Sequence, residues 1–271
     1  MADIRNPSEW REQNHPTDSY LRPDVFPTVW CSGCGIGTAL YGYLEASREA
    51  EIPPEKLRVV CGTGCTGAVA QCLNIKSYSI TDRSPVRFAA ELKQRRPDLT
   101  VSVFLNNADL MISGAADLRD VGRRNVPLIV ICVNNFVYAV GRDSASALTP
   151  YMRPSLDRRF ELPFNLPHMA LAYGAKYTAR WTPLRAGWFK ESIRESFGLS
   201  GLSLIEMISP CLIYDVGSGR ILDSVDRMKF YNDHSEIRFR EPASELDIRR
   251  RKKLILGVFG RSGMEMREDR Q

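Results

Sequence analysis

The chain has no long apolar run, no internal repeat and only three histidines, which are scattered at positions 15, 168 and 234. No segment approaches the length that crosses a bilayer, and the polar start lacks the apolar core of a signal peptide, so we expect a cytoplasmic protein with no membrane partner. The absence of a His-x-x-x-His pair and of an elbow-type serine argues against a zinc hydrolase and a serine hydrolase.

Most of the chain also lacks a net excess of positive or negative charge. Lys and Arg number 37 against 32 Asp and Glu, and residues 238–271 hold ten of the former and six of the latter, a net charge of +4. The body is therefore almost neutral, and the basic tail has no nucleic-acid motif, so we expect no nucleic-acid partner. With 44% hydrophobic and 25% charged residues among 271, the composition predicts one large globular domain.

Apolar segments alternate along the chain in the manner of an α/β protein with a mostly parallel, doubly wound sheet. The segments that read as strands are 57–61, 78–81, 100–105, 128–133, 176–179 and 203–208. Helical patterns lie at 38–50, 84–96, 113–124, 168–173 and 184–197, with Ser84 and Ser113 as expected N-caps.

Three regions follow from this pattern. Residues 1–29 contain four prolines and few apolar positions, which predicts an extended N-terminal arm. Residues 30–214 form the α/β domain, and residues 215–271 lose clear periodicity and are expected to be a C-terminal appendage. Because neither end can bury much apolar surface alone, we expect both to contact a partner subunit.

Polar side chains follow the two most apolar strands, 100–105 and 128–133. The first is followed by Asn106-Asn107-Ala108-Asp109 and the second by Asn134-Asn135-Phe136-Val137-Tyr138. These strands and the helical pattern between them make a βαβ unit, and such units bind ligands beyond the carboxyl ends of their strands. We therefore expect ligand-binding residues in these two turns.

Seven cysteines fall into two groups. Cys132 lies inside an apolar strand, Cys61 ends a strand and Cys72 lies on an apolar helical face, so all three are expected to be core residues. The others lie in loops bounded by glycine or proline: Cys31, Cys34, Cys65 and Cys211. In a reducing compartment such residues are ligands rather than disulfides. Four thiolates from three loops fit an iron–sulfur cluster or zinc, and the presence of only one close pair slightly favours the cluster; unrelated buried cysteines are the third alternative.

The cysteine motifs occur in a characteristic order. They are Trp-Cys-x-Gly-Cys-Gly at 30–35, Gly-x-Gly-Cys-x-Gly at 62–67 and Ser-Pro-Cys at 209–211, with Arg123-Arg124-Asn125 and Asn134-Asn135-x-x-Tyr138 between the last two. Over about residues 25–215 the chain thereby resembles the β subunit of 2-oxoacid:ferredoxin oxidoreductases. The resemblance implies a thiamine-diphosphate-binding fold, oxidation of a 2-oxoacid, and electron transfer through a [4Fe–4S] cluster held by Cys31, Cys34, Cys65 and Cys211.

The resemblance also implies a thiamine site. Thiamine diphosphate would be anchored through Mg²⁺, which the family binds with the Asp of a Gly-Asp-Gly motif, the second Asn of Asn-Asn and a carbonyl two residues later. These positions fall on Asn107, Asn135 and Val137. The other expected cofactor-binding residues are Gly33, Gly35, Gly64, Thr66, Ala108, Asp109 and Tyr138.

Several positions depart from the family pattern. Asn107 replaces the carboxylate, although Mg²⁺ prefers a charged oxygen ligand. The family's His-Gly-Arg is Thr81-Asp82-Arg83, its Gly-Met-Thr is Ala139-Val140-Gly141, and the His after Cys-Gly is Ile36. Arg83 alone is kept, and it would contact either a substrate carboxylate or a neighbouring acid.

Two functions follow from the resemblance. In the first, the chain is an active oxidoreductase subunit in a hetero-oligomer with α/γ-type subunits, acting on a small 2-oxoacid with ferredoxin or another iron–sulfur protein as acceptor. In the second, it is a degenerate, non-catalytic subunit that keeps the cluster for electron transfer or assembly but has lost thiamine and Mg²⁺. A zinc-stabilised module is a third reading. The residues identify neither the oxoacid nor the catalytic groups, and the family's activating Glu comes from the partner.

Overall fold

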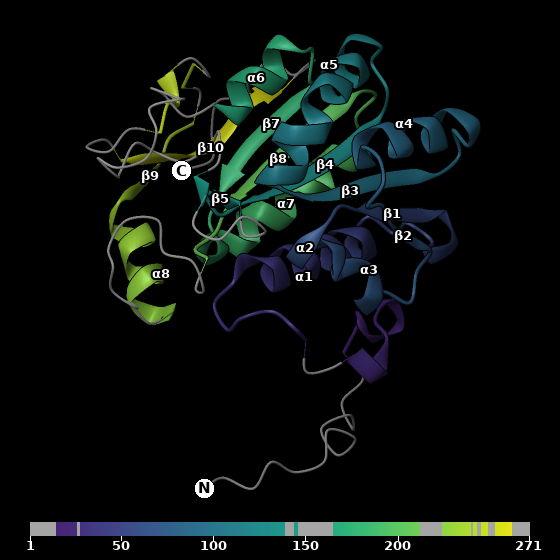
Figure 1. Ribbon diagram of the computed structural model, residues 1–271, viewed down its shortest axis with the longest axis horizontal. Coiled ribbons are helices and arrows are strands. Elements are labelled where there is room, and N and C mark those ends of the chain that lie inside the picture. The colour runs from purple at the N-terminus through teal and green to yellow at the C-terminus, as the bar shows by residue number, and fades with distance from the viewer. Residues whose placement is uncertain are drawn as a thin grey trace, which may run out of the picture.

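The computed structural model describes residues 15–25, 28–138, 144–145, 165–211, 224–239, 241–242, 245–248 and 253–261. Within these residues an eight-stranded sheet runs through the centre, in the order β2-β1-β3-β4-β8-β7-β10-β9 (Figure 1). Its strands are β1 (Leu57–Cys61), β2 (Ser77–Ser79), β3 (Thr100–Asn106), β4 (Leu128–Asn134), β7 (Tyr177–Trp181), β8 (Leu202–Ile208), β9 (Ser235–Ile237) and β10 (Leu254–Arg261). Neighbours from β2 to β7 are all parallel, which confirms the expected α/β fold.

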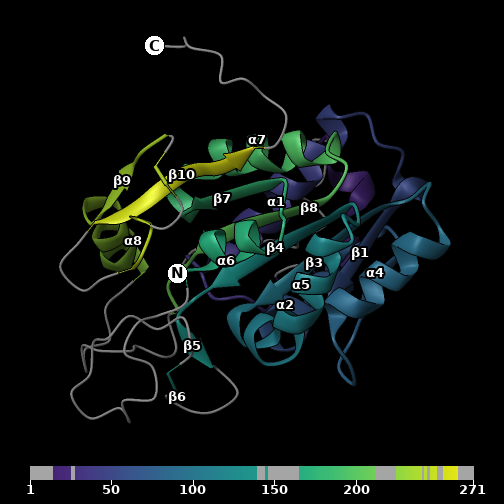
Figure 2. The same cartoon turned by 90° about the horizontal axis from the view of Figure 1, so that it is seen from above.

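Helices cover both faces of the sheet. The helices are α1 (Gly35–Glu49), α2 (Gly64–Gly67), α3 (Val69–Cys72), α4 (Pro85–Arg95), α5 (Ala115–Arg123), α6 (Leu166–Ala172), α7 (Ala186–Phe197) and α8 (Ser224–Asp233). Helices α1 and α7 pack on one face, and α4, α5 and α6 on the other (Figure 2). Strand β4 is buried along its whole length, as its unbroken apolar sequence predicts for a central parallel strand.

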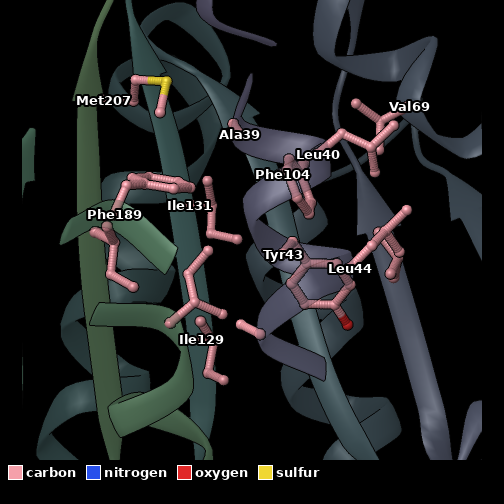
Figure 3. Close-up of a cluster of buried hydrophobic side chains, with 14 of the residues drawn as sticks. Ala39, Leu40, Tyr43, Leu44, Val69, Phe104, Ile129, Ile131, Phe189 and Met207 are labelled. Atoms are coloured by element: carbon pink, nitrogen blue, oxygen red, sulfur yellow. The ribbon is translucent and has the colours of Figure 1, made fainter. Parts of the chain in front are cut away.

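The two faces have separate apolar cores. In the core beneath α1, Tyr43 meets Phe104 of β3 edge to face, with ring centroids 5.5 Å apart. Phe189 of α7 and Met207 of β8 lie on the same side of the sheet (Figure 3). This core fixes the start of α1 close to the carboxyl ends of the strands, where the cysteine loops lie.

Of the two expected N-caps, Ser84 is confirmed and Ser113 is wrong. The Ser84 hydroxyl accepts a hydrogen bond from the Arg87 amide at 3.3 Å, as expected of an N-cap. Ser113 does not cap a helix. It lies inside a π-helix (Asp109–Gly114) that precedes α5, and its hydroxyl donates to the Asp109 carbonyl at 2.8 Å. Helix α1 also begins at Gly35, three residues before the expected start at Thr38.

Both ends of the chain contribute more to the fold than expected. The sheet does not end with β8, because β10 pairs antiparallel with β7 and β9 pairs with β10. At the other end, Tyr20 is buried, and the Asn74 amide donates to its carbonyl at 2.8 Å. The part of the arm that the structure describes, residues 15–25, therefore packs against the body.

Two further strands, β5 (Val137–Tyr138) and β6 (Ser144–Ala145), form a small antiparallel pair. The expected arm segment 1–14 and most of the loop 139–164 lie outside the described residues. Among the helices that the structure describes, none is both long and apolar enough to cross a membrane.

Candidate functional site

The three cysteine-bearing loops meet at the carboxyl edge of the sheet. Cys31 and Cys34 precede α1, and Cys211 follows β8. Cys65, expected in a loop, lies in the short helix α2 that follows β1. The Trp30 indole Nε1 donates to the Cys65 carbonyl at 2.9 Å, which ties the first loop to the second. The Gly35 amide donates to the Ser209 hydroxyl at 2.8 Å, which ties the first loop to the third.

Gly35 is required for this arrangement. A Cβ at this position would lie 2.8 Å from Pro183 Cγ, 2.9 Å from Met207 Sδ and 2.9 Å from Ser209 Oγ, closer than real Cβ contacts. The missing side chain therefore lets the start of α1 approach the end of β8. This close approach brings Cys34 to Ser209, and hence to the loop that carries Cys211.

The four loop thiols interact with one another. Cys34 experiences the charges of Cys65 and Cys31, and Cys65 experiences those of Cys211 and Cys31. Loss of hydration is the main cause that raises the pKa of both Cys34 and Cys65, and the neighbouring thiols raise it further. Burial and these neighbours therefore both oppose ionisation of the Cys34 and Cys65 thiols.

The spacing of these thiols bears on the choice of metal. Among the described residues, no group of three or more His, Cys, Asp and Glu side chains lies close enough to hold a single metal ion. Four ligands of one zinc ion would have to converge on one point. The side chains that the structure describes therefore form no ready-made site for a single ion.

The remaining cysteines are packing residues, as expected. Cys61 and Cys132 are fully buried within β1 and β4, and Cys72 is buried on α3. Burial raises the pKa of all three thiols. None of them contributes to the group of loop thiols.

The turn after β3 holds the expected magnesium position. Asn107 is fully buried and stands in the helical turn that leads into the π-helix. Asp109 lies two residues later, at the start of the π-helix. Its carboxylate accepts hydrogen bonds from Thr63, at 2.8 Å from the amide and 2.6 Å from the hydroxyl. The sequence reasoning missed Thr63, because these partners are 46 residues apart.

The turn after β4 presents Asn135. The Asn134 side-chain oxygen accepts from the Phe136 amide at 3.1 Å, and Phe136 has the left-handed φ of 63°. An Asn that bonds the backbone two residues on forms an Asx-turn. This turn leaves Asn135 partly exposed beside the end of β3, because Asn106 and Val133 are neighbours in the sheet.

A buried ion pair is hydrogen-bonded to the turn after β4. Arg180 of β7 and Glu206 of β8 are opposite each other in the sheet, with Nε and Oε2 2.6 Å apart and both side chains inaccessible to solvent. The other Glu206 oxygen accepts from Asn134 Nδ2 at 2.7 Å. Sequence reasoning missed this network, although a charge inside each of two apolar strands was a readable signal.

Arg83 is placed beside a neighbouring acid. Its guanidinium lies 3.3 Å from a Glu91 carboxylate oxygen and 4.8 Å from the ring centroid of Phe88. Of the two alternatives weighed for Arg83, this is the contact with a neighbouring acid. The side chains of Val137 and Tyr138 lie outside the described residues, although their backbone forms β5.

Comparison with known proteins places these features in a family. The model for the thiamine pyrophosphate enzyme C-terminal TPP-binding domain matches residues 82–207. The 2-oxoglutarate synthase subunit KorB of Methanocaldococcus jannaschii is 34% identical over 224 residues, which are 82% of this chain and 83% of that protein. The 2-oxoacid:ferredoxin oxidoreductase subunit beta of a Sulfolobus species is 30% identical over 199 residues, which are 69% of this chain and 63% of that protein.

A solved structure shares the fold. The 2-oxoglutarate:ferredoxin oxidoreductase of Magnetococcus marinus superposes with a TM-score of 0.78 at 21% identity, and the match covers 94% of this chain and 87% of that one. The family match, the relatives over most of their length and the parallel sheet with its cysteine loops agree with one another. The chain belongs to the family of β subunits of 2-oxoacid:ferredoxin oxidoreductases and is an oxidoreductase subunit.

Proposed function

We propose that the chain binds a [4Fe–4S] cluster and thiamine diphosphate in a cytoplasmic complex that oxidatively decarboxylates a 2-oxoacid. Electrons leave through the cluster to ferredoxin or another iron–sulfur protein. One observation carries the proposal: thiols from three loops gather at the edge of the sheet that also presents the turns of Asn107 and Asn135.

The cluster fits the chemistry of the thiols. Cys31, Cys34, Cys65 and Cys211 are free thiols, and thiolates are soft ligands that suit iron–sulfur clusters. The raised pKa of Cys34 and Cys65 also means that their thiolates need the positive charge of the metal.

Thiamine diphosphate, when bound, supplies the carbanion-stabilising chemistry that decarboxylation needs. The part of this chain is to hold it. The amide oxygens of Asn107 and Asn135 and the carbonyl of Val137 would bind Mg²⁺, with Gly33, Gly35, Gly64, Thr66, Ala108 and Tyr138 around the cofactors. This donor set has no charge, so the diphosphate would provide all of the negative charge at the ion.

The substrate is a small 2-oxoacid, and 2-oxoglutarate is the first to test because relatives of this chain are named 2-oxoglutarate synthase subunits. Arg83 is a proposed contact for a substrate carboxylate. To bind it, Arg83 would release the carboxylate of Glu91. Further subunits of the complex complete the site.

A specific observation favours a second function. The Asp109 carboxylate, the acidic group nearest to Asn107 in the sequence, is already held by Thr63. A subunit that has lost thiamine and Mg²⁺ but keeps its cluster would have this arrangement. Such a chain would carry electrons, or support assembly, without catalysis.

Substitution of each loop cysteine tests the cluster. In the anaerobically purified complex we expect about four irons per chain. Cys31→Ala, Cys34→Ala, Cys65→Ala and Cys211→Ala should each lose most of this iron, whereas the buried control Cys72→Ala should keep it. Stoichiometric zinc without iron would contradict the proposal. Ferredoxin reduction that depends on 2-oxoglutarate then separates the enzyme from the non-catalytic subunit.

A further inference from the structure

The Asp109 carboxylate is joined to the loop that carries Cys65. One carboxylate oxygen accepts from the Thr63 amide at 2.8 Å, and the other accepts from the Thr63 hydroxyl at 2.6 Å. A side chain at Gly62 would collide with this carboxylate. The bare backbone at Gly62 therefore admits Asp109 to a position where both of its oxygens face the loop.

Asn106 holds the same loop from the other direction. Its Nδ2 donates to the Thr63 carbonyl at 3.0 Å, and its Oδ1 accepts from the Asp109 amide at 2.8 Å. The Thr66 hydroxyl also donates to the Thr63 carbonyl at 3.0 Å. All the polar groups of Thr63 are thus bonded, to Asn106 at the end of β3, to Asp109 at the start of the π-helix and to Thr66.

The contact is made at the start of a π-helix, whose hydrogen bonds span five residues rather than the four of an α-helix. Asp109 is its first residue, and Ser113 closes the turn by donating to the Asp109 carbonyl. The Asp109 carboxylate is directed at Thr63, and the residue is only 7% exposed.

Cys65 follows Thr63 by two residues and has a hydrogen bond of its own to the first cysteine loop. Its carbonyl accepts from the Trp30 indole at 2.9 Å, and Trp30 belongs to the loop of Cys31 and Cys34. The Cys65 segment is thus fixed between the end of β3 and the first cysteine loop. Of these supports, only that from Asp109 carries a formal charge.

We propose that Asp109 is a positioning residue for the cluster: by holding Thr63, it sets the place of the Cys65 thiolate relative to the other three ligands. This inference rests on the proposed function, since it presupposes the cluster. It also assigns to Asp109 a task different from metal binding at the thiamine site. The end of β3 then contacts both cofactor sites, with Asn107 toward one and Asp109 toward the other.

The test compares Asp109→Asn with Asp117→Asn in the anaerobically purified complex. Asp117 is a good control because its carboxylate is also nearly buried and accepts from Arg87 at 2.9 Å, but it lies on α5. Asn at position 109 keeps the shape but can accept only one of the two Thr63 hydrogen bonds. We expect Asp109→Asn to lose iron to a chelator at least about tenfold faster and to shift the electron paramagnetic resonance spectrum of the reduced cluster.

Thr63 provides a second pair of variants if Asp109→Asn folds poorly. Thr63→Val removes the hydroxyl but keeps the amide, and should show the same spectral shift in weaker form. Thr63→Ser restores the hydroxyl and should restore the spectrum of the unchanged protein. If Asp109 and Thr63 merely stabilised the fold, Thr63→Val would lower the melting temperature and leave the spectrum unchanged.

Two outcomes overturn different statements. Equal chelation rates and identical spectra for Asp109→Asn and the unchanged complex would overturn the positioning role and leave the cluster intact. An unchanged complex without any iron–sulfur spectrum would overturn the proposed function itself. The melting temperature, measured in parallel, should fall for both Asp109→Asn and Asp117→Asn, whereas the spectrum should change only for the first.

Discussion

At the scale of single residues, two neighbouring positions after β3 have different proposed roles: Asn107 binds Mg²⁺, and Asp109 holds Thr63. Asn107 is buried and neutral where the family has an acidic metal ligand, whereas Asp109 is acidic but is engaged by Thr63. Under the proposed function, this turn supports the cluster through Asp109 and offers Mg²⁺ only the neutral amide of Asn107. A neutral amide oxygen binds Mg²⁺ less strongly than a carboxylate does, so we expect weak Mg²⁺ binding at Asn107.

Asn107→Asp should strengthen the binding of Mg²⁺ with thiamine diphosphate about tenfold or more, because a carboxylate adds charge to a neutral donor set. The same change buries a charge in the metal-free protein, so its melting temperature without Mg²⁺ should fall. Titration calorimetry and thermal unfolding, each with and without Mg²⁺, measure the two effects. Asn107→Leu, which has no oxygen, should bind more weakly than the unchanged protein. Equal affinities for all three proteins would show that position 107 is not a metal ligand.

Cys61 gives a prediction about pH. Burial raises the pKa of its thiol to about 12, whereas an unfolded cysteine has a pKa of about 8.5. Above the lower value the unfolded chain loses this proton and the folded chain does not, so stability falls as pH rises toward the folded pKa.

Cys61→Ala should therefore reduce the dependence of the unfolding free energy on pH above about pH 9, by up to about 1.4 kcal/mol per pH unit. Its stability at pH 7 should be lower, since the substitution leaves a small cavity. Urea unfolding at several pH values from neutral to alkaline measures both. Parallel curves for the two proteins would mean that Cys61 ionises as easily in the folded chain as in the unfolded one.

At the scale of elements, the junction of α1 with the end of β8 holds two cysteine loops together. Gly35→Ala would place a methyl group 2.8 Å from Pro183 and 2.9 Å from both Met207 and Ser209. Overpacking of this kind costs about 1–3 kcal/mol. We also expect loss of iron, because the shift of α1 would separate Cys34 from the loop of Cys211.

Gly187→Ala is the matched control for this prediction. Gly187 lies in α7, and a Cβ there would meet nothing within 4 Å. Alanine in an open helical position should stabilise the protein by up to about 1 kcal/mol. Chemical unfolding and iron analysis of both variants make the comparison, and equal effects at the two glycines would contradict the proposed role of the α1 junction.

Much of the element pattern was predictable because it depends on local sequence. The strand at 57–61, the buried strand ending at Asn134 and the Ser84 cap all follow from apolar runs and cap chemistry. The π-helix was not predictable, because its six residues are too few to show a period of their own. Ser113 therefore looked like a cap.

The site shows the same division. The four cysteines and the two Asn turns could be found from motifs and from their places after strands. Their supports could not, because the partners are far apart in the sequence: Gly35 and Ser209 are separated by 174 residues, and Thr63 and Asp109 by 46. Such contacts depend on the strand order, which local patterns do not determine.

At the scale of the whole molecule, the C-terminal segment is part of the sheet as well as a proposed partner surface. Leu256 of β10 is fully buried, and the Leu246 carbonyl accepts from Arg180 at 2.9 Å. The segment therefore supports β7 and the buried Arg180–Glu206 pair. We propose that the N-terminal arm and the basic tail also contact further subunits of the complex.

Leu256→Ala should lower the unfolding free energy by about 2–5 kcal/mol, as expected for a buried leucine. The exposed Ile112, of which 73% is accessible, serves as the control, and Ile112→Ala should change stability by less than about 0.5 kcal/mol. Urea unfolding of the two variants tests whether β10 belongs to the cooperative fold. A difference of less than about 1 kcal/mol between them would indicate that β10 is only loosely attached.

The central claim is that the four loop thiols bind one iron–sulfur cluster at the carboxyl edge of the sheet. Iron anomalous diffraction from crystals of the anaerobically purified complex tests it most directly. We expect a compact group of four iron peaks, with one iron bonded to each of Cys31, Cys34, Cys65 and Cys211. A single zinc peak, or irons bonded to other residues, would contradict the account.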